Sequence, residues 1–192
     1  MEREGTRARV VATTAELLEA QSYHATGLNQ ILQQSATPKG SLYHHFPGGK
    51  EALAAEAVEV AGQAITHDLD ALIATGADFS TALALLITFF CERLQNSDFQ
   101  KGCPLATVTL ETAATSEPIQ QACRNVYHIW QTRIEQLLVA SGWLPTRAPT
   151  MALFALSAIE GALILCRAER STLPLEQVAE ELRQIVQERG IR

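Results

Sequence analysis

Residues 36–54 read "ATPKGSLYHHFPGGKEALA" and stand apart from the Ala-, Leu- and Glu-rich chain around them. They include two lysines, two adjacent histidines, one tyrosine and three glycines. A phosphate-binding loop, a metal site and a helix that reads DNA all use such residues. These three interpretations predict different proteins, and the surrounding sequence distinguishes between them.

The composition is that of a soluble, folded protein. The 192 residues are enough to bury a core, and a chain with 47% hydrophobic and 19% charged residues is neither disordered nor fibrous. The N-terminal segment "MEREGTRARV" has no apolar run of the kind found in secretory signals. The longest apolar run, residues 151–166, includes Glu160 and is shorter than a bilayer requires, so we interpret it as a buried helix without a membrane partner.

Four cysteines lie far apart in the chain, at Cys91, Cys103, Cys123 and Cys166. Their spacing fits neither a CxxC metal motif nor a disulfide framework. Free thiols suit a reducing compartment, so we expect a cytoplasmic protein. The sequence predicts no metal and no cofactor.

The distribution of charge limits where nucleic acid can bind. The net charge of −6 would by itself argue against such a partner. However, residues 1–50 hold five basic and four acidic residues, whereas residues 51–192 hold ten basic and seventeen acidic ones. A surface that faces phosphates is therefore expected within the first 50 residues.

The apolar pattern predicts an all-α fold of about nine helices, because apolar residues recur mostly three and four positions apart. Two domains are expected: a three-helix DNA-binding head over residues 1–50, and a body over residues 51–192 for ligand binding and dimerisation. A long helix that follows Gly49 is expected to join them.

The head is predicted to hold one longer helix and two short ones. The first runs from about Arg7 to Gln21, and the second is capped by Thr26. The third covers Pro38 to His44, with Thr37 as its cap and the proline in its first turn. Two short helices separated by a brief turn and braced by a longer helix are typical of a helix-turn-helix DNA-binding motif.

The residues of the third helix suit DNA recognition. Lys39 and Lys50 can neutralise phosphates, Ser41 and Tyr43 can donate to phosphate oxygens, and His44 can reach a base edge. Gly40 lowers helix propensity by about 1 kcal/mol relative to alanine, which suggests a steric need for close approach to the duplex. Packing of Leu42 and Phe46 toward the second helix would leave an outward face, which consists of Thr37, Pro38, Ser41 and His44.

The other interpretations of this stretch are weaker. Adjacent residues on a helix point about 100° apart, so His44 and His45 cannot easily share a metal, and no third ligand is evident. The segment "GGK" lacks the spacing of a nucleotide-binding loop, and no strand precedes it. A half-buried aromatic helix end without a ligand is disfavoured by the neighbouring glycine and lysines.

The segment "TGLNQILQQSATPKGSLYHHFPGGKEAL" (residues 26–53) resembles the DNA-binding head of TetR/AcrR-type repressors. "PKGSLYHHFPGGKE" together with the later "GCPLATVTLE" is similar to the LmrA/YxaF-like branch of that family. The resemblance implies that the following residues contact DNA: Thr26, Gly27, Thr37, Pro38, Lys39, Ser41, Tyr43, His44 and Lys50. Thr37 and Pro38 depart from the valine or alanine and serine often found there, so an operator sequence cannot be transferred.

Polar and aromatic residues interrupt the apolar helices of the body. Each is most simply a core residue, but together they are typical of a small-molecule pocket, and the resemblance implies an inducer site. The predicted set is Phe89, Phe90, Cys103, Thr107, Glu111, His128 and Trp130. Binding of a hydrophobic or aromatic inducer is expected to release the operator through an allosteric shift of the long fourth helix.

Two alternatives remain open. Cys103 stands near a predicted helix start, which would favour a reactive thiolate and a redox- or electrophile-sensing regulator. Alternatively, an α-helical enzyme could use His128, Glu111 and Cys103 as base, orienting group and nucleophile. The preferred prediction is a transcriptional repressor that is not an enzyme.

The last two predicted helices carry many small and aliphatic residues. An exposed apolar face of this extent would seek a partner, and a two-fold homodimer would present two heads to successive major grooves. The predicted dimerisation residues are Ala155, Ala158, Gly161, Ala162, Leu165, Val178, Leu182 and Ile185.

Overall fold

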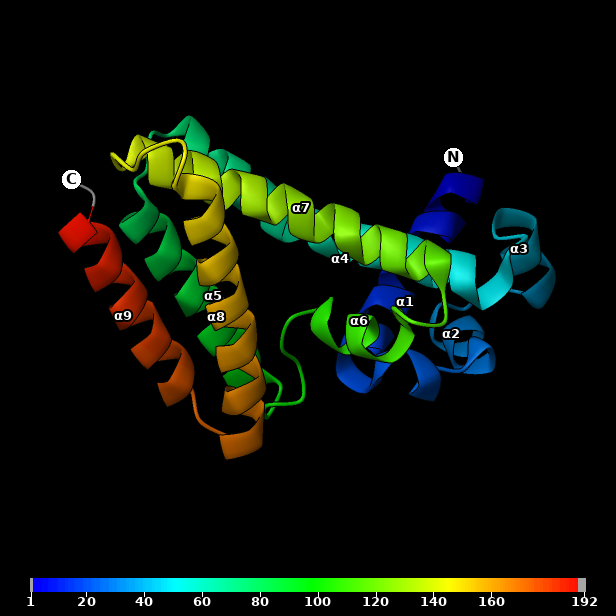
Figure 1. Ribbon diagram of the computed structural model, residues 1–192. Helices are drawn as coiled ribbons and strands as arrows, with labels where there is room; N and C mark the ends of the chain where they lie inside the picture. Colours follow the sequence, from blue (N-terminus) through cyan, green and yellow to red (C-terminus); the bar gives the residue numbers. More distant parts are fainter. Residues whose placement is uncertain (1, 190–192) are drawn as a thin grey trace. The chain divides into compact units, whose positions relative to one another are not determined.

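A computed structural model describes residues 2–189. Over these residues the chain forms nine α-helices and no strand, so the predicted all-α fold is confirmed (Figure 1). The helices are α1 (Glu2–Ala25), α2 (Leu28–Gln34), α3 (Lys39–His45), α4 (Gly49–Ala74), α5 (Phe79–Asn96), α6 (Ala106–Thr112), α7 (Glu117–Ala140), α8 (Ala148–Glu169) and α9 (Leu173–Arg189).

The chain divides into two compact units. The head unit consists of the chain up to Ala64 together with Pro104–Val126, and the body unit consists of Ile65–Cys103 together with the chain from Tyr127 onward. Helices α4 and α7 each contribute residues to both units. The domain boundary predicted at residue 50 separates two functions and stays a prediction. By contacts within the chain, α6 and the first part of α7 belong to the head unit.

In the head unit, α1 packs against α2, α3 and α6 (Figure 1). The side chains of Leu42 and Phe46 are buried on the inner face of α3, and Ile31 of α2 is fully buried. Their four-residue spacing places Leu42 and Phe46 on one side of the helix. The predicted inward packing of α3 is therefore confirmed, and its opposite face is turned to solvent.

The helix ends in the head differ from the predicted ones. The Thr26 hydroxyl donates to the Ser22 carbonyl at 2.6 Å, and Gly27 is the N-cap of α2. The Thr37 hydroxyl donates to the Ser35 carbonyl at 3.2 Å, which leaves Pro38 as the N-cap of α3. Both threonines were wrongly predicted as caps, because their hydroxyls bind backward to carbonyl oxygens instead of forward to free N–H groups.

Helix α1 extends beyond its predicted end at Gln21 through a kink. Ser22 has φ 66° and ψ −178°, which lies outside the helical region, and the chain resumes helical geometry up to Ala25. A positive φ is unfavourable for a serine, so surrounding contacts must hold it. Those contacts come from α6.

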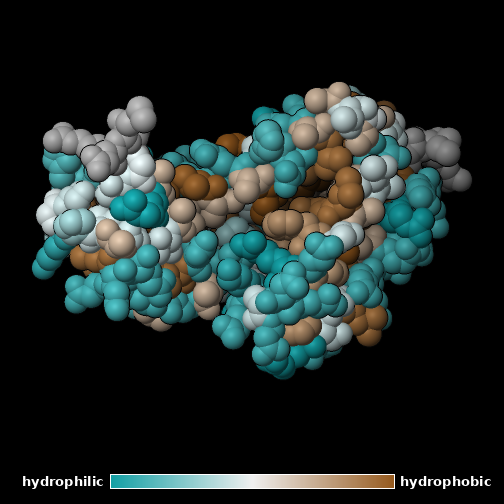
Figure 2. Space-filling view, turned by 180° about the vertical axis from the view of Figure 1, so that it is seen from behind, coloured by the Kyte–Doolittle hydropathy of each residue, from teal (hydrophilic) through white to brown (hydrophobic). Residues whose placement is uncertain are grey.

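In the body unit, α9 packs against both α8 and α5. Figure 2 views the molecule from behind and shows hydrophobic side chains gathered around a hollow on this face. Helix α8 has 22 residues and contains an 18-residue window with a mean hydropathy of 1.8, of which 39% is buried. By length and composition alone such a helix could cross a membrane, but the core helix of a soluble protein has the same properties. The apolar run 151–166 thus lies inside a longer helix, which begins before residue 151 and ends after residue 166, and the interpretation of this run as a buried helix stays a prediction.

Candidate nucleic-acid interface and ligand site

The outer face of α3 presents most of the residues predicted to contact DNA. Pro38, Lys39, Gly40 and His44 are exposed, and Tyr43 retains 45% of its accessible surface. Ser41 is half-buried on the same helix. The structure thus places a cation, a phenol and an imidazole on a helix that is anchored from behind by apolar packing.

Nothing in the fold requires a glycine at position 40. A Cβ atom at this position would meet nothing within 4 Å, and the residue lies inside α3 with no positive φ. Alanine would therefore fit and would raise helix propensity by about 1 kcal/mol. The absence of a side chain is consistent with close approach of an outside partner.

Thr26 and Thr37 are buried, with 0% and 5% of their surface exposed. The prediction that Thr37 faces outward is wrong, because its hydroxyl turns to the Ser35 carbonyl inside the head. Gly27 next to Thr26 remains exposed. Of the DNA-contact set, the two threonines therefore support the turn instead of presenting their hydroxyls at the surface.

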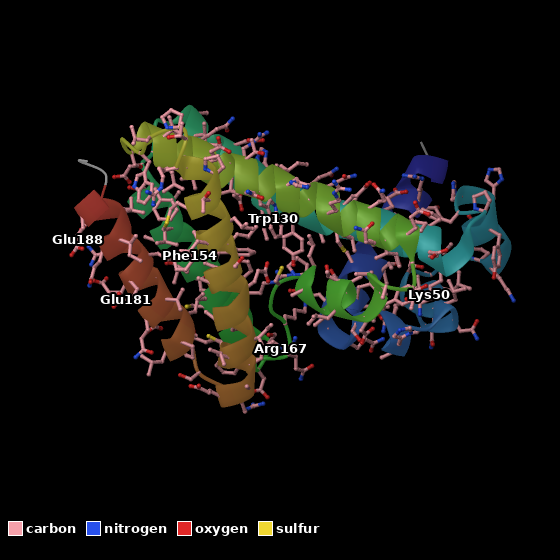
Figure 3. All side chains as sticks on the ribbon, in the orientation of Figure 1. Lys50, Trp130, Phe154, Arg167, Glu181 and Glu188 are labelled. Atoms are coloured by element: carbon pink, nitrogen blue, oxygen red, sulfur yellow. The ribbon has the colours of Figure 1, made fainter. Side chains whose placement is uncertain are left out.

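Lys50, labelled in Figure 3, is held by α1. Its Nζ donates to the Tyr23 carbonyl at 2.6 Å and lies 4.1 Å from the centroid of the Tyr23 ring. Burial lowers the pKa of this ammonium, while the Glu111 carboxylate acts in the opposite direction. Lys50 therefore fixes the start of α4 to the end of α1, a role that its sequence position did not reveal.

Two arginines of α1 also brace the head, and sequence reasoning assigned neither of them a role. Arg9 donates to the Ser35 carbonyl at 2.6 Å, which ties α1 to the turn between α2 and α3. Arg7 pairs with Glu56 of α4, and its guanidinium lies 5.2 Å from the centroid of the Phe46 ring. Lys39, in contrast, makes no ion pair among the described residues, so its charge is available to a phosphate.

Glu111 of α6 holds the kink of α1. Its carboxylate accepts hydrogen bonds from the Ser22 hydroxyl and, at 2.9 Å, from the His24 backbone N–H. Burial alone would raise the pKa of Glu111, but these hydrogen bonds outweigh it and hold the pKa below its usual value. The structure therefore places this predicted ligand-binding residue in the head unit, at the Ser22 kink.

We expect Glu111→Gln to destabilise the protein by about 1 to 2 kcal/mol at pH 7, because charge-assisted hydrogen bonds to the kink are weakened. A lowered pKa means that the carboxylate contributes stability above its unfolded value of 4.5, and that this contribution is lost as pH falls through the lowered folded value. The difference from wild type in urea unfolding should therefore shrink toward pH 3. Exposed Glu117→Gln is the control, and an equal loss in both variants would contradict the assignment.

The predicted ligand residues do not line one cavity. A cavity of about 280 Å³ lies between α4 and α5 in the body unit, and of the seven residues Phe89 is the one that lines it. Phe90 is buried in the core, His128 is exposed on α7, and Thr107 belongs to the head unit. The lining consists of Ile65, Asp68, Leu69, Ala71, Leu72, Leu85, Leu86 and Phe89.

A second group in the body unit surrounds Glu160, a half-buried acid that the prediction missed. The Glu160 carboxyl of α8 accepts hydrogen bonds from Cys103 and Tyr127. Burial raises its pKa to about 7, although these hydrogen bonds act in the opposite direction. The signal in the sequence was an acid inside the apolar run 151–166.

Cys103 is 4% exposed and α6 begins only at Ala106, so the redox-sensing alternative is not favoured.

The predicted dimerisation residues divide between the inside and the outside of the body unit. Ala155, Ala162 and Leu182 are buried within their own chain, so the prediction that they lie on an exposed face is wrong. Packing of α8 on α9 takes up that side of each helix. Ala158, Val178 and Ile185 are half-buried, whereas Gly161 and Leu165 are exposed. The exposed apolar residues of α8 are Leu153, Phe154, Ile164 and Leu165.

Comparisons with known proteins agree with this arrangement. Residues 10–57 match the model of bacterial regulatory proteins of the tetR family, and residues 80–181 match the C-terminal domain of LmrA/YxaF-like transcriptional regulators. The chain is 35% identical over 184 residues to the HTH-type transcriptional regulator YxaF of Bacillus subtilis, with 96% of each chain covered. It is 33% identical over 174 residues to the HTH-type transcriptional regulator LmrA of the same organism, covering 90% and 92%.

Solved structures share the fold. A TetR-family transcriptional regulator from Cytophaga hutchinsonii superposes with a TM-score of 0.85 at 20% identity, covering 100% of this chain and 98% of that one. The tetR-family model covers most of α1, all of α2 and α3 and the start of α4, and the LmrA/YxaF-like model covers α5 to α8 and the first part of α9. From its two matching domains and its relatives, the chain belongs to the TetR family of bacterial transcriptional regulators, in the LmrA/YxaF-like branch.

Proposed function

We propose that this regulator represses transcription from the cytoplasm by inserting α3 into the major groove of an operator, and that a small molecule bound in the body unit releases it. The observation that carries the proposal is the solvent-facing side of α3, where Lys39, Tyr43 and His44 surround a glycine with open space around it. Such a face suits contacts to phosphates and base edges.

Operator binding is the experiment that tests this proposal. Fluorescence anisotropy with labelled duplex from the region flanking the coding sequence should show binding at low salt. Because phosphate contacts release counterions, the affinity should fall steeply as salt rises. Absence of binding to this DNA at low salt, under conditions where the protein is folded, would contradict the proposal.

We further propose a homodimer formed through the exposed side of α8. Leu153, Phe154, Ile164 and Leu165 each keep more than half of their surface exposed, and they share this side with Gly161. A Cβ at Gly161 would meet nothing within 4 Å, so a partner helix can approach closely there. Two-fold pairing would present two heads to successive major grooves.

The dimer predicts a specific effect for Phe154, labelled in Figure 3. Phe154→Asp should convert the dimer to a monomer in light scattering, because it would bury a charge in an apolar interface. Leu110→Asp, at a leucine of α6 that is even more exposed than Phe154, should leave the dimer intact. Retention of the dimer by Phe154→Asp, or equal dissociation of both variants, would argue against this surface.

Ligand control is proposed to act through α4. This helix begins at Gly49, next to α3 in sequence, and its residues from Ile65 onward line the body cavity. A ligand that favours one position of α4 would change operator affinity by a coupling energy of typically about 1 to 3 kcal/mol. The inducer is proposed to be hydrophobic or aromatic, since the body offers mainly apolar surface.

No catalytic role is proposed for the three residues of the enzyme alternative. Glu111 already accepts hydrogen bonds from Ser22 and His24, and Cys103 is hydrogen-bonded to the Glu160 carboxyl. His128 lies exposed on α7. Each side chain therefore has an environment that suits structure or solvent exposure better than a shared reaction.

A further inference from the structure

The kink of α1 at Ser22 has a backbone conformation that a serine adopts only under constraint. With φ 66° and ψ −178°, the residue lies in a region that is occupied almost exclusively by glycine. An uninterrupted helix through this position would avoid that strain. The kink therefore depends on contacts from the rest of the head unit that favour it over a straight helix.

The kink offers two consecutive carbonyl groups to the segment that contains α2 and α3. The Ser22 carbonyl accepts from the Thr26 hydroxyl at 2.6 Å, two residues before α2 begins. The Tyr23 carbonyl accepts from Nζ of Lys50 at 2.6 Å, in the first turn of α4 (Figure 3). Residues 27–49 are thus anchored at both of their ends to the kink.

Glu111 of α6 stabilises the kinked form of α1. Its carboxylate accepts from the Ser22 hydroxyl and, at 2.9 Å, from the His24 backbone N–H. In an uninterrupted helix this N–H would donate to the carbonyl four residues earlier. The carboxylate therefore supplies the kink with acceptors that a straight helix would not need.

We infer that Glu111 and Lys50 are positioning residues for operator binding, which act through the Ser22 kink and not by contact with DNA. This inference rests on the proposed insertion of α3 into an operator and specifies what holds α3 in place. The sequence predicted a phosphate contact for Lys50, yet its Nζ is bound to the Tyr23 carbonyl and lies 4.1 Å from the centroid of the Tyr23 ring. Its ammonium is thus engaged by the fold, whereas that of Lys39 is exposed.

Salt dependence separates positioning from phosphate contact. Lys50→Met keeps most of the apolar stem and removes the charge, so it should weaken operator binding by about tenfold through loss of the bond to α1. The slope of log affinity against log salt should stay at the wild-type value, because no phosphate contact is lost. Lys39→Ala is the comparison, since removal of a phosphate contact lowers that slope by about one unit. An equal fall of the slope in Lys50→Met, or an unchanged affinity, would overturn the role of Lys50.

Rescue at the kink separates positioning from a general loss of stability. Glu111→Ala should weaken operator binding by about tenfold under conditions where circular dichroism shows folded protein, because the strain at Ser22 is no longer offset. Adding Ser22→Gly should restore most of the affinity, since glycine adopts the kinked conformation without strain. Adding Ser22→Ala removes the same hydroxyl but keeps the strain, so it should restore nothing.

Two results would overturn the role of Glu111. The first is a loss of affinity in Glu111→Ala that is no larger than in Glu117→Ala, at an exposed position of α7. The second is an equal effect of Ser22→Gly and Ser22→Ala on the Glu111→Ala protein, since the backbone strain would then have no part in operator binding.

The same titrations distinguish failure of this inference from failure of the proposed function. If the wild-type protein did not bind the duplex, the insertion of α3 would be contradicted, and the inference with it. If the wild-type protein bound and Lys39→Ala weakened it, but neither Lys50→Met nor Glu111→Ala did, the proposed function would stand and the inference alone would be overturned.

Discussion

Replacing Lys39 by alanine should weaken operator binding by about tenfold per head, and by about a hundredfold in a dimer that uses both heads. Lys39 begins α3, is exposed, and makes no ion pair among the described residues. Its removal therefore takes away a cation that is proposed to face the phosphates, and no ion pair of the fold is lost. The slope of log affinity against log salt should fall by about one unit for each lysine–phosphate pair that is removed.

Tyr43→Ala should add to this effect, since the phenol lies on the same exposed face and its hydroxyl can donate to a phosphate. Anisotropy titrations at several salt concentrations measure both quantities, and circular dichroism checks that α3 remains folded. Lys101→Ala removes a body lysine as the matched control. If Lys39→Ala kept the wild-type affinity and salt slope, α3 would not be the DNA-reading helix.

Gly62→Ala should destabilise the protein strongly, because α4 and α7 cross closely at this residue. A Cβ atom at Gly62 would lie 2.3 Å from Val126 Cγ1 and 2.9 Å from its Cγ2. Alanine gains up to about 1 kcal/mol of helix propensity, but overpacking of two methyl groups typically costs about 1 to 3 kcal/mol and here has little room to relax. For a chain of this size, we expect the thermal midpoint to fall by several degrees.

The compensating change is Val126→Ala, which removes both clashing methyl groups. The double variant should be more stable than Gly62→Ala alone, so that the two substitutions are strongly non-additive. Urea unfolding of all four proteins at one protein concentration measures this coupling. Additive losses, or a Gly62→Ala protein as stable as wild type, would show that the helices separate easily.

The sequence predicted the architecture of the head well, because short-range patterns determine it. Leu42 and Phe46 are four residues apart, and that spacing alone places both on the buried side of α3. The hydroxyls of Thr26 and Thr37 were misjudged because a threonine can bind either a forward N–H or a backward carbonyl, and only the surrounding turn selects between them.

The ligand and dimer residues depended on information that periodicity does not contain. Helix α8 is apolar on more than one side, so the pattern could not show that Ala155 and Ala162 pack inward while Phe154 and Leu165 remain exposed. Glu111 was assigned to the pocket because it interrupts an apolar helix, yet its partners are Ser22 and His24, almost ninety positions earlier. A contact between residues so far apart in the chain can be identified only from the three-dimensional structure.

Because the space around Gly40 is open, a side chain at this position could affect DNA binding without affecting folding. A Cβ atom there would meet nothing in the free protein, so if α3 enters the major groove as proposed, the cost of a side chain would arise in the bound duplex. After gene duplication, a copy could therefore change its set of promoters through this codon without first acquiring a compensating change in its interior. Under that proposal, a substitution at position 40 would alter target choice while the scaffold of the protein stays the same.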